Sequence, residues 1–200
     1  MSDKILRTIL LVIIAELALV NICFGQKADS VAKPKSTFSV CIGAGWTHYI
    51  NTLQITDDKF VKKDYIGGSL RVLWEPGYRI SMGVESGFYR VYKVFKEITP
   101  DVSGQSILYN VPIFLVARMR VVNNFYISVA PGISVLFSKI RGVGPPIRSV
   151  QWSFSNFQAD ASYLYPLNKH LQVGASANFL TIGKTNDYMY SLFGVVAVKF

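Results

Sequence analysis

The chain ends in Tyr190-Ser191-Leu192-Phe193-Gly194-Val195-Val196-Ala197-Val198-Lys199-Phe200, and this stretch decides the fold class. Positions 190, 192, 196, 198 and 200 form one apolar and aromatic row, with Gly194 in the middle. That spacing is the two-residue period of a β-strand and not the period of a helix. A strand that ends on an exposed aromatic residue suits a bilayer interface, where aromatic girdles flank the apolar band of a transmembrane barrel. The stretch therefore predicts a membrane-spanning strand.

The same alternation recurs along the chain from Ser36 onward. We expect about eight such segments, at 38–46, 66–74, 78–85, 109–118, 125–135, 157–163, 171–179 and 190–200. In each segment one face is aliphatic or aromatic, and the other face is small or polar. A soluble barrel would bury the aliphatic face, whereas a membrane barrel turns it outward. The pattern predicts an all-β protein, a single eight-stranded antiparallel up-and-down transmembrane β-barrel over residues 36–200.

The lengths of the predicted connections alternate. Residues 47–64, 92–105 and 138–153 make long connections, while 75–77, 121–124 and 166–169 make short ones. Outer-membrane barrels have short periplasmic turns and longer extracellular loops. This order predicts that the N- and C-termini of the mature chain both lie in the periplasm of a bacterial outer membrane.

The N-terminus has the layout of a secretory signal peptide. Lys4 and Arg7 precede an apolar run from Ile9 to Val20, and Gly25 is a small residue suited to a cleavage site. We expect residues 1–25 to be removed and 26–35 to form a short periplasmic segment. Two alternatives remain open: an uncleaved membrane anchor, and a lipoprotein that is lipidated on Cys23. After cleavage Cys41 would be the one remaining cysteine, so no internal disulfide is expected.

Charged residues on the polar faces predict what fills the barrel. An eight-stranded barrel is just wide enough inside for side chains. Arg71, Arg79, Glu85, Arg118 and Asp160 are expected to meet there as a lumen charge network. Mutual pairing would offset the large cost of burying each charge alone. A structural ion-pair plug is the favoured interpretation, and a gated ion path through rearranging pairs is the alternative.

Two neighbouring strands resemble a known family. Leu108-Tyr109-Asn110-Val111-Pro112-Ile113-Phe114-Leu115-Val116-Ala117-Arg118 is similar to the Y-x-I/V-P-L/I-x-x-K/R strand of small PorT-like outer-membrane β-barrel proteins. The following Phe125–Ser134 looks like that family's F-Y-x-x-x-G-P-x strand, with Ala130 where glycine is common. The resemblance implies the barrel fold over about residues 36–200, and it carries no shared catalytic set. Phe200, Val198 and Val196 likewise resemble the C-terminal signal that outer-membrane barrels present to the barrel-assembly machinery.

Candidate chemistry outside the barrel wall is sparse. His48 shares its predicted loop with Asp57, Asp58 and Asp64, so a histidine–acid pair could act as a general base. No serine stands at a motif-like spacing from it, and the two histidines and one mature cysteine lie too far apart in the chain to predict a metal site. No cofactor is expected.

The formal net charge of +9 calls for an anionic partner or a solubility role. The predicted loop 138–153 carries Lys139, Arg141 and Arg148 without an acid, so these residues are candidate contacts for the phosphates of lipopolysaccharide. Nucleic acid is not expected, because no basic-aromatic motif is present and the predicted compartment excludes it.

Three functions are open at this point. The first is a non-enzymatic outer-membrane barrel with a structural, interaction or secretion/envelope-accessory role, and outer-membrane lipid or envelope proteins as partners. The alternatives are a lipid-modifying enzyme that uses His48, and a secreted lipocalin-like binder of small ligands.

Overall fold

The computed structural model describes residues 36–50, 61–99, 102–142 and 145–200. The chain divides into two units, Met1–Lys33 and Pro34–Phe200, and the described residues belong to the second. The predicted signal peptide and the segment 26–35 lie outside the described residues. Among the described residues, no helix has the length and apolar character needed to cross a bilayer.

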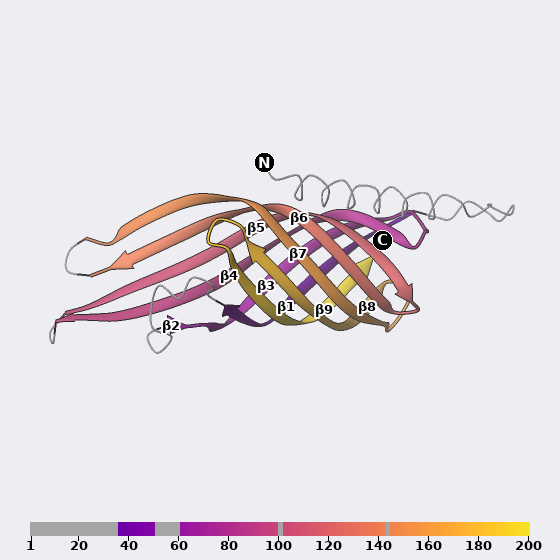
Figure 1. The fold of residues 1–200 in the computed structure, drawn as a ribbon. Helices are drawn as coiled ribbons and strands as arrows, with labels where there is room; N and C mark the ends of the chain where they lie inside the picture. The colour runs from indigo at the N-terminus through magenta and orange to yellow at the C-terminus, as the bar shows by residue number, and fades with distance from the viewer. Residues whose placement is uncertain (1–35, 51–60, 100–101, 143–144) are drawn as a thin grey trace, which may run out of the picture. The chain divides into compact units, whose positions relative to one another are not determined.

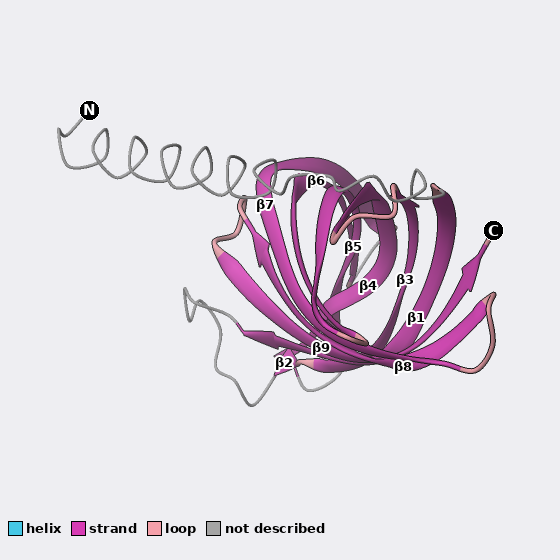
Figure 2. Cartoon of the chain, turned by 90° about the vertical axis from the view of Figure 1, so that its right-hand side faces the viewer, coloured by secondary structure: helices cyan, strands magenta, loops and turns pink. Residues whose placement is uncertain are grey.

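Nine β-strands form the described structure. They are β1 (Thr37–Ile50), β2 (Val61–Lys62), β3 (Asp64–Glu75), β4 (Ile80–Thr99), β5 (Val102–Val122), β6 (Phe125–Arg141), β7 (Ile147–Pro166), β8 (Leu171–Ile182) and β9 (Asp187–Lys199). The strand order is β2-β4-β3-β1-β9-β8-β7-β6-β5, with β4 paired to β5. Because β2 and β3 meet the same edge of β4, the wall has eight positions and closes into a barrel (Figures 1 and 2).

All pairings in the wall are antiparallel, and the chain closes on itself through β1 and β9. The backbone of Phe200 donates its N–H to the carbonyl of Phe38 at 2.8 Å, so the last residue joins the same seam. Three short turns, β3–β4, β5–β6 and β7–β8, lie at the barrel end that holds Thr37 and Phe200, which we call the turn end. The opposite end is called the hairpin end.

Strand parity shows that the predicted apolar faces point outward. Phe38, Ile42 and Trp46 of β1 are 56%, 59% and 45% exposed, whereas Ser39 and Cys41 between them are buried. On β5, Ile113 and Leu115 are exposed while Phe114 is fully buried. A soluble lipocalin-like barrel would show the reverse arrangement. The prediction of an inside-out, closed eight-stranded barrel is therefore confirmed.

Exposed aromatic residues flank the aliphatic band at both ends. Those towards the turn end are Phe38, Trp74, Tyr78, Phe125, Tyr163 and Tyr165, and those towards the hairpin end are Trp46, Phe88, Trp152, Phe154 and Tyr190. Amphipathic rings of this kind are stabilised at the level of lipid headgroups. The outer surface thus has the two girdles of a membrane barrel.

Two of the predicted long connections are continuous strand pairs. β4 and β5 run to Thr99 and Val102, and β6 and β7 run to Arg141 and Ile147, where loops had been predicted at 92–105 and 138–153. The hairpin β8–β9 is much shorter, because β8 ends at Ile182 and β9 begins at Asp187. The hairpins β4–β5 and β6–β7 therefore project beyond the hairpin end of the barrel (Figure 1).

Candidate functional site: a charged lumen behind an apolar wall

Arg71 on β3 is the centre of the larger ion cluster in the lumen. Its guanidinium lies 2.6 Å from Glu85 Oε2 and 2.9 Å from Asp160 Oδ1, and it donates to Ser128 Oγ at 3.3 Å. Gln158 donates to the second oxygen of Glu85 at 3.1 Å. These contacts join β3, β4, β6 and β7 across the barrel, because the inward parity of all four strands points the side chains at one another.

A second cluster surrounds Glu75 near the turn end. The guanidinium of Arg118 and the hydroxyl of Ser39 both donate to Glu75 Oε1, and Lys199 Nζ lies 3.0 Å from Oε2. The Arg118 guanidinium also lies over the ring of Tyr126, 4.6 Å from its centroid. This cluster ties β1, β3, β5 and β9 together at the seam where the barrel closes.

The two clusters balance each other in charge. The first holds one cation and two anions, the second holds two cations and one anion, so three of each meet in the lumen. The side chains of Glu85 and Asp160 are only 2% and 1% exposed. Isolated charges at such depth would be very costly, and mutual pairing offsets part of that cost. Asp160 Oδ2 and Arg118 Nε are buried without a hydrogen-bond partner among the described residues.

The membership of the network differs from the prediction at one residue. Arg79 is exposed and lies in the β3–β4 turn, because β4 begins at Ile80 and not at Tyr78. Its carbonyl accepts a hydrogen bond from the backbone N–H of Arg120 on β5. Glu75 and Lys199 were missed. Both side chains point into the barrel. Alternation indicates this, since Glu75 lies an even number of residues from the inward Arg71, and Lys199 follows the outward Val198.

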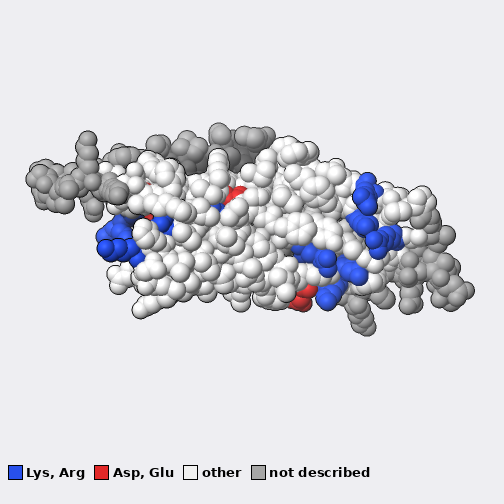
Figure 3. All heavy atoms as spheres, turned by 180° about the vertical axis from the view of Figure 1, so that it is seen from behind, with Lys and Arg blue, Asp and Glu red and all other residues white. Residues whose placement is uncertain are grey.

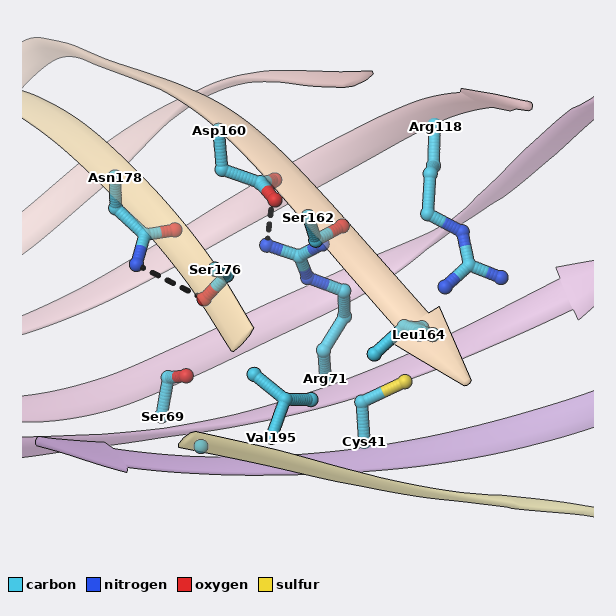
Figure 4. A pocket seen from close by; sticks show the side chains of 11 residues that line it. Cys41, Ser69, Arg71, Arg118, Asp160, Ser162, Leu164, Ser176, Asn178 and Val195 are labelled. Carbon is cyan, nitrogen blue, oxygen red and sulfur yellow. Dashed lines mark hydrogen bonds and ion pairs between the residues drawn. The ribbon is translucent and has the colours of Figure 1, made fainter. Parts of the chain in front are cut away.

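A small cavity of about 20 Å³ lies beside Arg71. Figure 4 shows the guanidinium directed at Asp160 and Ser162, with Cys41 and Val195 on the opposite wall. A single water molecule needs about 10–15 Å³, so the cavity holds little more than one. This cavity by itself is too small to be a path for ions.

Apolar side chains fill the lumen on the hairpin-end side of the ion clusters. Tyr89 and Phe193 stack with their ring centroids 6.1 Å apart. Towards the hairpin end a second buried group follows, formed by Tyr49, Val91, Leu108, Leu136 and Ile182. The lumen is thus filled by side chains in layers, as expected for a barrel of this size.

His48 stands on the hairpin-end rim. Its Nδ1 lies 2.8 Å from Asp64 Oδ1, and its ring stacks on Trp46, which donates its indole N–H to the same carboxylate oxygen at 3.0 Å. Asp57 and Asp58 lie outside the described residues. Within the described ranges, no hydrogen bond joins His48 to a serine, threonine or cysteine. The pair could orient a base, but no described residue places a hydrogen-bonded nucleophile beside it.

The remaining predicted contact residues lie at opposite ends of the wall. Lys139 and Arg141 are on β6 and Arg148 is on β7, all on the projecting hairpin. Phe200 is 71% exposed and Val196 is 46% exposed on the outer face at the turn end. In the part of the chain that the structure describes, no group of three or more potential metal ligands occurs.

Solved structures share this fold at low sequence identity. The attachment invasion locus protein Ail of Yersinia pestis matches with a TM-score of 0.52 and 15% identity, over 83% of this chain and 99% of that chain. Ail in complex with the heparin analogue sucrose octasulfate matches with a TM-score of 0.51, 14% identity and the same coverage. A major outer membrane protein from Thermus thermophilus matches with a TM-score of 0.51 and 15% identity, over 82% of this chain and 99% of that chain.

No protein-family model matches the chain. No curated protein matches it in sequence. The PorT-like resemblance therefore stays a prediction, and the structural matches support the coarser conclusion that this is the fold of small outer-membrane β-barrels.

Proposed function

We propose that the chain is a non-enzymatic outer-membrane β-barrel protein that serves the envelope as a structural or interaction component. The observation that carries this proposal is the combination of an apolar, aromatic-girdled outer face with a lumen in which three cations are paired with three anions. An apolar outer wall needs lipid, and a filled lumen leaves the outer surface as the place for interaction.

The same proposal places the turn end in the periplasm and the projecting hairpins outside the cell. Short periplasmic turns and long outer connections are the rule for outer-membrane barrels. Residues 1–25 then act as the signal peptide, and Phe200, Val198 and Val196 act as the signal to the assembly machinery. A PorT-like role in secretion or envelope maintenance is the finer form of the proposal, and it rests on the strand motifs at 108–118 and 125–134.

The structural neighbour Ail gives a second reason to look for ligands at the surface, since it has been crystallised with an anionic sugar analogue. In this chain the described cations that are not paired in the lumen lie towards the two ends of the barrel. Figure 3 shows Lys and Arg gathered in groups that a mostly uncharged stretch separates. Anionic partners at the membrane surface fit that distribution.

Cell fractionation, a heat-modifiability gel and planar-bilayer recording test the proposal together. We expect the protein in the outer-membrane fraction, a shift in gel migration on boiling, and no stable conductance steps, because the lumen is filled. Recovery of the mature chain in a soluble fraction without detergent would contradict the membrane assignment. Regular conductance steps from pure protein would instead favour the gated path through the Arg71 cluster.

A further inference from the structure

A row of cations crosses the outer face of the projecting sheet. Lys62 on β2 pairs with Lys93 on β4, which pairs with Ile107 on β5. Ile107 pairs with Lys139 on β6, which pairs with Arg148 on β7. Residues that are directly opposite in an antiparallel sheet point to the same face. The four cations, which we call the cation row, therefore line up across five strands over roughly 19 Å, at 4.7–4.9 Å per strand.

Repulsion between the neighbouring charges of the cation row destabilises the sheet unless an anion binds there. Lys62 stands directly opposite Lys93, and Lys139 stands directly opposite Arg148. Like charges in such positions destabilise a sheet. None of the four forms an ion pair with another described residue. The Nζ atoms of Lys62 and Lys93 lie over the rings of Tyr65 and Phe95, and Lys62 also interacts electrostatically with Asp64 without forming an ion pair.

Two β-bulges turn the row to the outside. On β4 the register shifts between Arg90 and Tyr92, so that the extra residue Val91 is buried and Lys93 takes the outward parity. On β7 the extra residue lies between Ser153 and Asn156, where Ser155 has a φ of 64°. Without these insertions, Lys93 and Arg148 would point into the barrel, since one residue reverses the side-chain direction.

Apolar rows lie directly on the barrel side of the cations. Tyr109, Phe137 and Val150 pair in the next outward row, about 7 Å away at two residues per strand. Arg90 of β4 pairs with Tyr109 at the end of that row, and its guanidinium donates to the Tyr109 hydroxyl at 3.2 Å. Val111, Val135 and Trp152 form the row after it. Val150 and Trp152 are 59% and 53% exposed. A surface with cations above and apolar side chains below matches an amphiphile with anionic groups over acyl chains, whereas a soluble polyanion needs no apolar rows.

We propose that the cation row binds the phosphate groups of an anionic outer-leaflet lipid of the lipopolysaccharide class, with the acyl chains on the apolar and aromatic side chains of the two rows below. This inference rests on the proposed outer-membrane function and names its ligand class. Arg148 offers a guanidinium fork for a phosphate, and the lysines act as point charges beside it. Arg141, one row nearer the hairpin tip, is a candidate for sugar-borne phosphates.

The test compares lipids and variants on the folded full chain. Detergent-solubilised protein is titrated with phosphatidylcholine vesicles that contain either lipid A or dephosphorylated lipid A with the same acyl chains, and retained lipid is counted by mass spectrometry. The row variant carries K93Q, K139Q and R148Q. The matched control carries R79Q, R120Q and K169Q, which are exposed at the turn end and remove the same charge.

The wild type and the control variant should retain lipid A in preference to the dephosphorylated form. The row variant should lose about 100-fold in affinity for lipid A, since each cation near an anionic surface contributes about fivefold. Equal retention of the two lipids by the wild type, or equal losses in the two variants, would overturn the inference. Tighter binding of soluble inositol hexakisphosphate than of lipid A would also overturn it and indicate a soluble polyanion.

Heat-modifiable migration separates the two possible failures. A wild type that migrates as a folded barrel but shows no phosphate preference contradicts the cation row alone. A wild type that never gives the folded band contradicts the proposed membrane function. The comparison of the two lipids on the wild type decides the inference even where the row variant does not fold.

Discussion

Arg71 links two carboxylates that cannot reach bulk water. Its contacts with Glu85 and Asp160 are short, and the side chains of both acids are almost fully buried. Removing one partner from a buried ion pair is far more costly than removing an exposed charge, because the remaining charge stays desolvated. The stability of the barrel should therefore depend on Arg71 much more than on the exposed Arg79 in the β3–β4 turn.

Replacement of Arg71 by methionine tests this dependence. We expect Arg71→Met to lower the free energy of unfolding by about 3–5 kcal/mol, since Glu85 and Asp160 would lose their cation. Arg79→Met, which removes an exposed turn cation, should change it by less than about 0.5 kcal/mol. Urea unfolding of the protein in lipid vesicles measures both values, and similar losses in the two variants would contradict the assignment of Arg71 to the lumen and Arg79 to the turn.

For single residues, the sequence predicts which face of the barrel wall a side chain lies on better than it predicts which residues that side chain contacts. The alternation put Phe114 and Tyr126 on the inner face, and both are buried there. It also suggested that Arg79 lies inside, because it does not show where a turn ends and a strand begins. Glu75 was assigned to the turn Glu75-Pro76-Gly77, although it is the last inward residue of β3.

A buried amide connects the bulge on β7 to the neighbouring turn. Asn156 Oδ1 accepts the Gly183 N–H at 2.8 Å and the Ser153 hydroxyl at 2.9 Å, which joins the bulge to the β8–β9 turn. Ser153 Oγ in turn accepts the Lys184 N–H at 3.1 Å. This network stabilises the reversal of side-chain direction that places Trp152 and Arg148 on the outer face.

Loss of the Asn156 amide should weaken this element. Asn156→Ala leaves the Gly183 N–H without its acceptor, so we expect a loss of roughly 1–3 kcal/mol in the free energy of unfolding. Faster hydrogen exchange of the Gly183 amide should accompany it. Gln151→Ala, an exposed change on the same strand, is the control and should leave both quantities unchanged. Unaltered exchange at Gly183 in the Asn156 variant would show that the bulge does not need this side chain.

Strand lengths were the least predictable feature of the elements. Residues 92–105 and 138–153 contain polar residues, glycines and prolines that are typical of loops. Their pairing into projecting hairpins comes from cross-strand contacts between segments, which periodicity within one segment does not reveal. The bulges at Val91 and Ser155 hide the alternation further, because each shifts its phase by one residue.

For the molecule as a whole, the proposed function depends on which face of the barrel wall points outward. The two-residue period and the sorting of aliphatic from small and polar residues predicted eight strands and their faces. Sequence alone could not show whether the aliphatic face points to lipid or to a shared core, since both arrangements have the same period. The exposed aliphatic rows and the buried Arg71 cluster establish the outward orientation.

Depth-dependent fluorescence quenching tests that orientation most directly. Single cysteines are placed at the outward residues Leu70, Leu115 and Leu192, in a chain with Cys23 and Cys41 replaced by serine, and are labelled with a fluorophore in lipid vesicles. Brominated acyl chains should quench all three labels, and aqueous iodide should not, while a label at the turn residue Lys169 should show the reverse. Iodide quenching at the three outward sites, without quenching by brominated lipid, would contradict an outer wall that faces the bilayer.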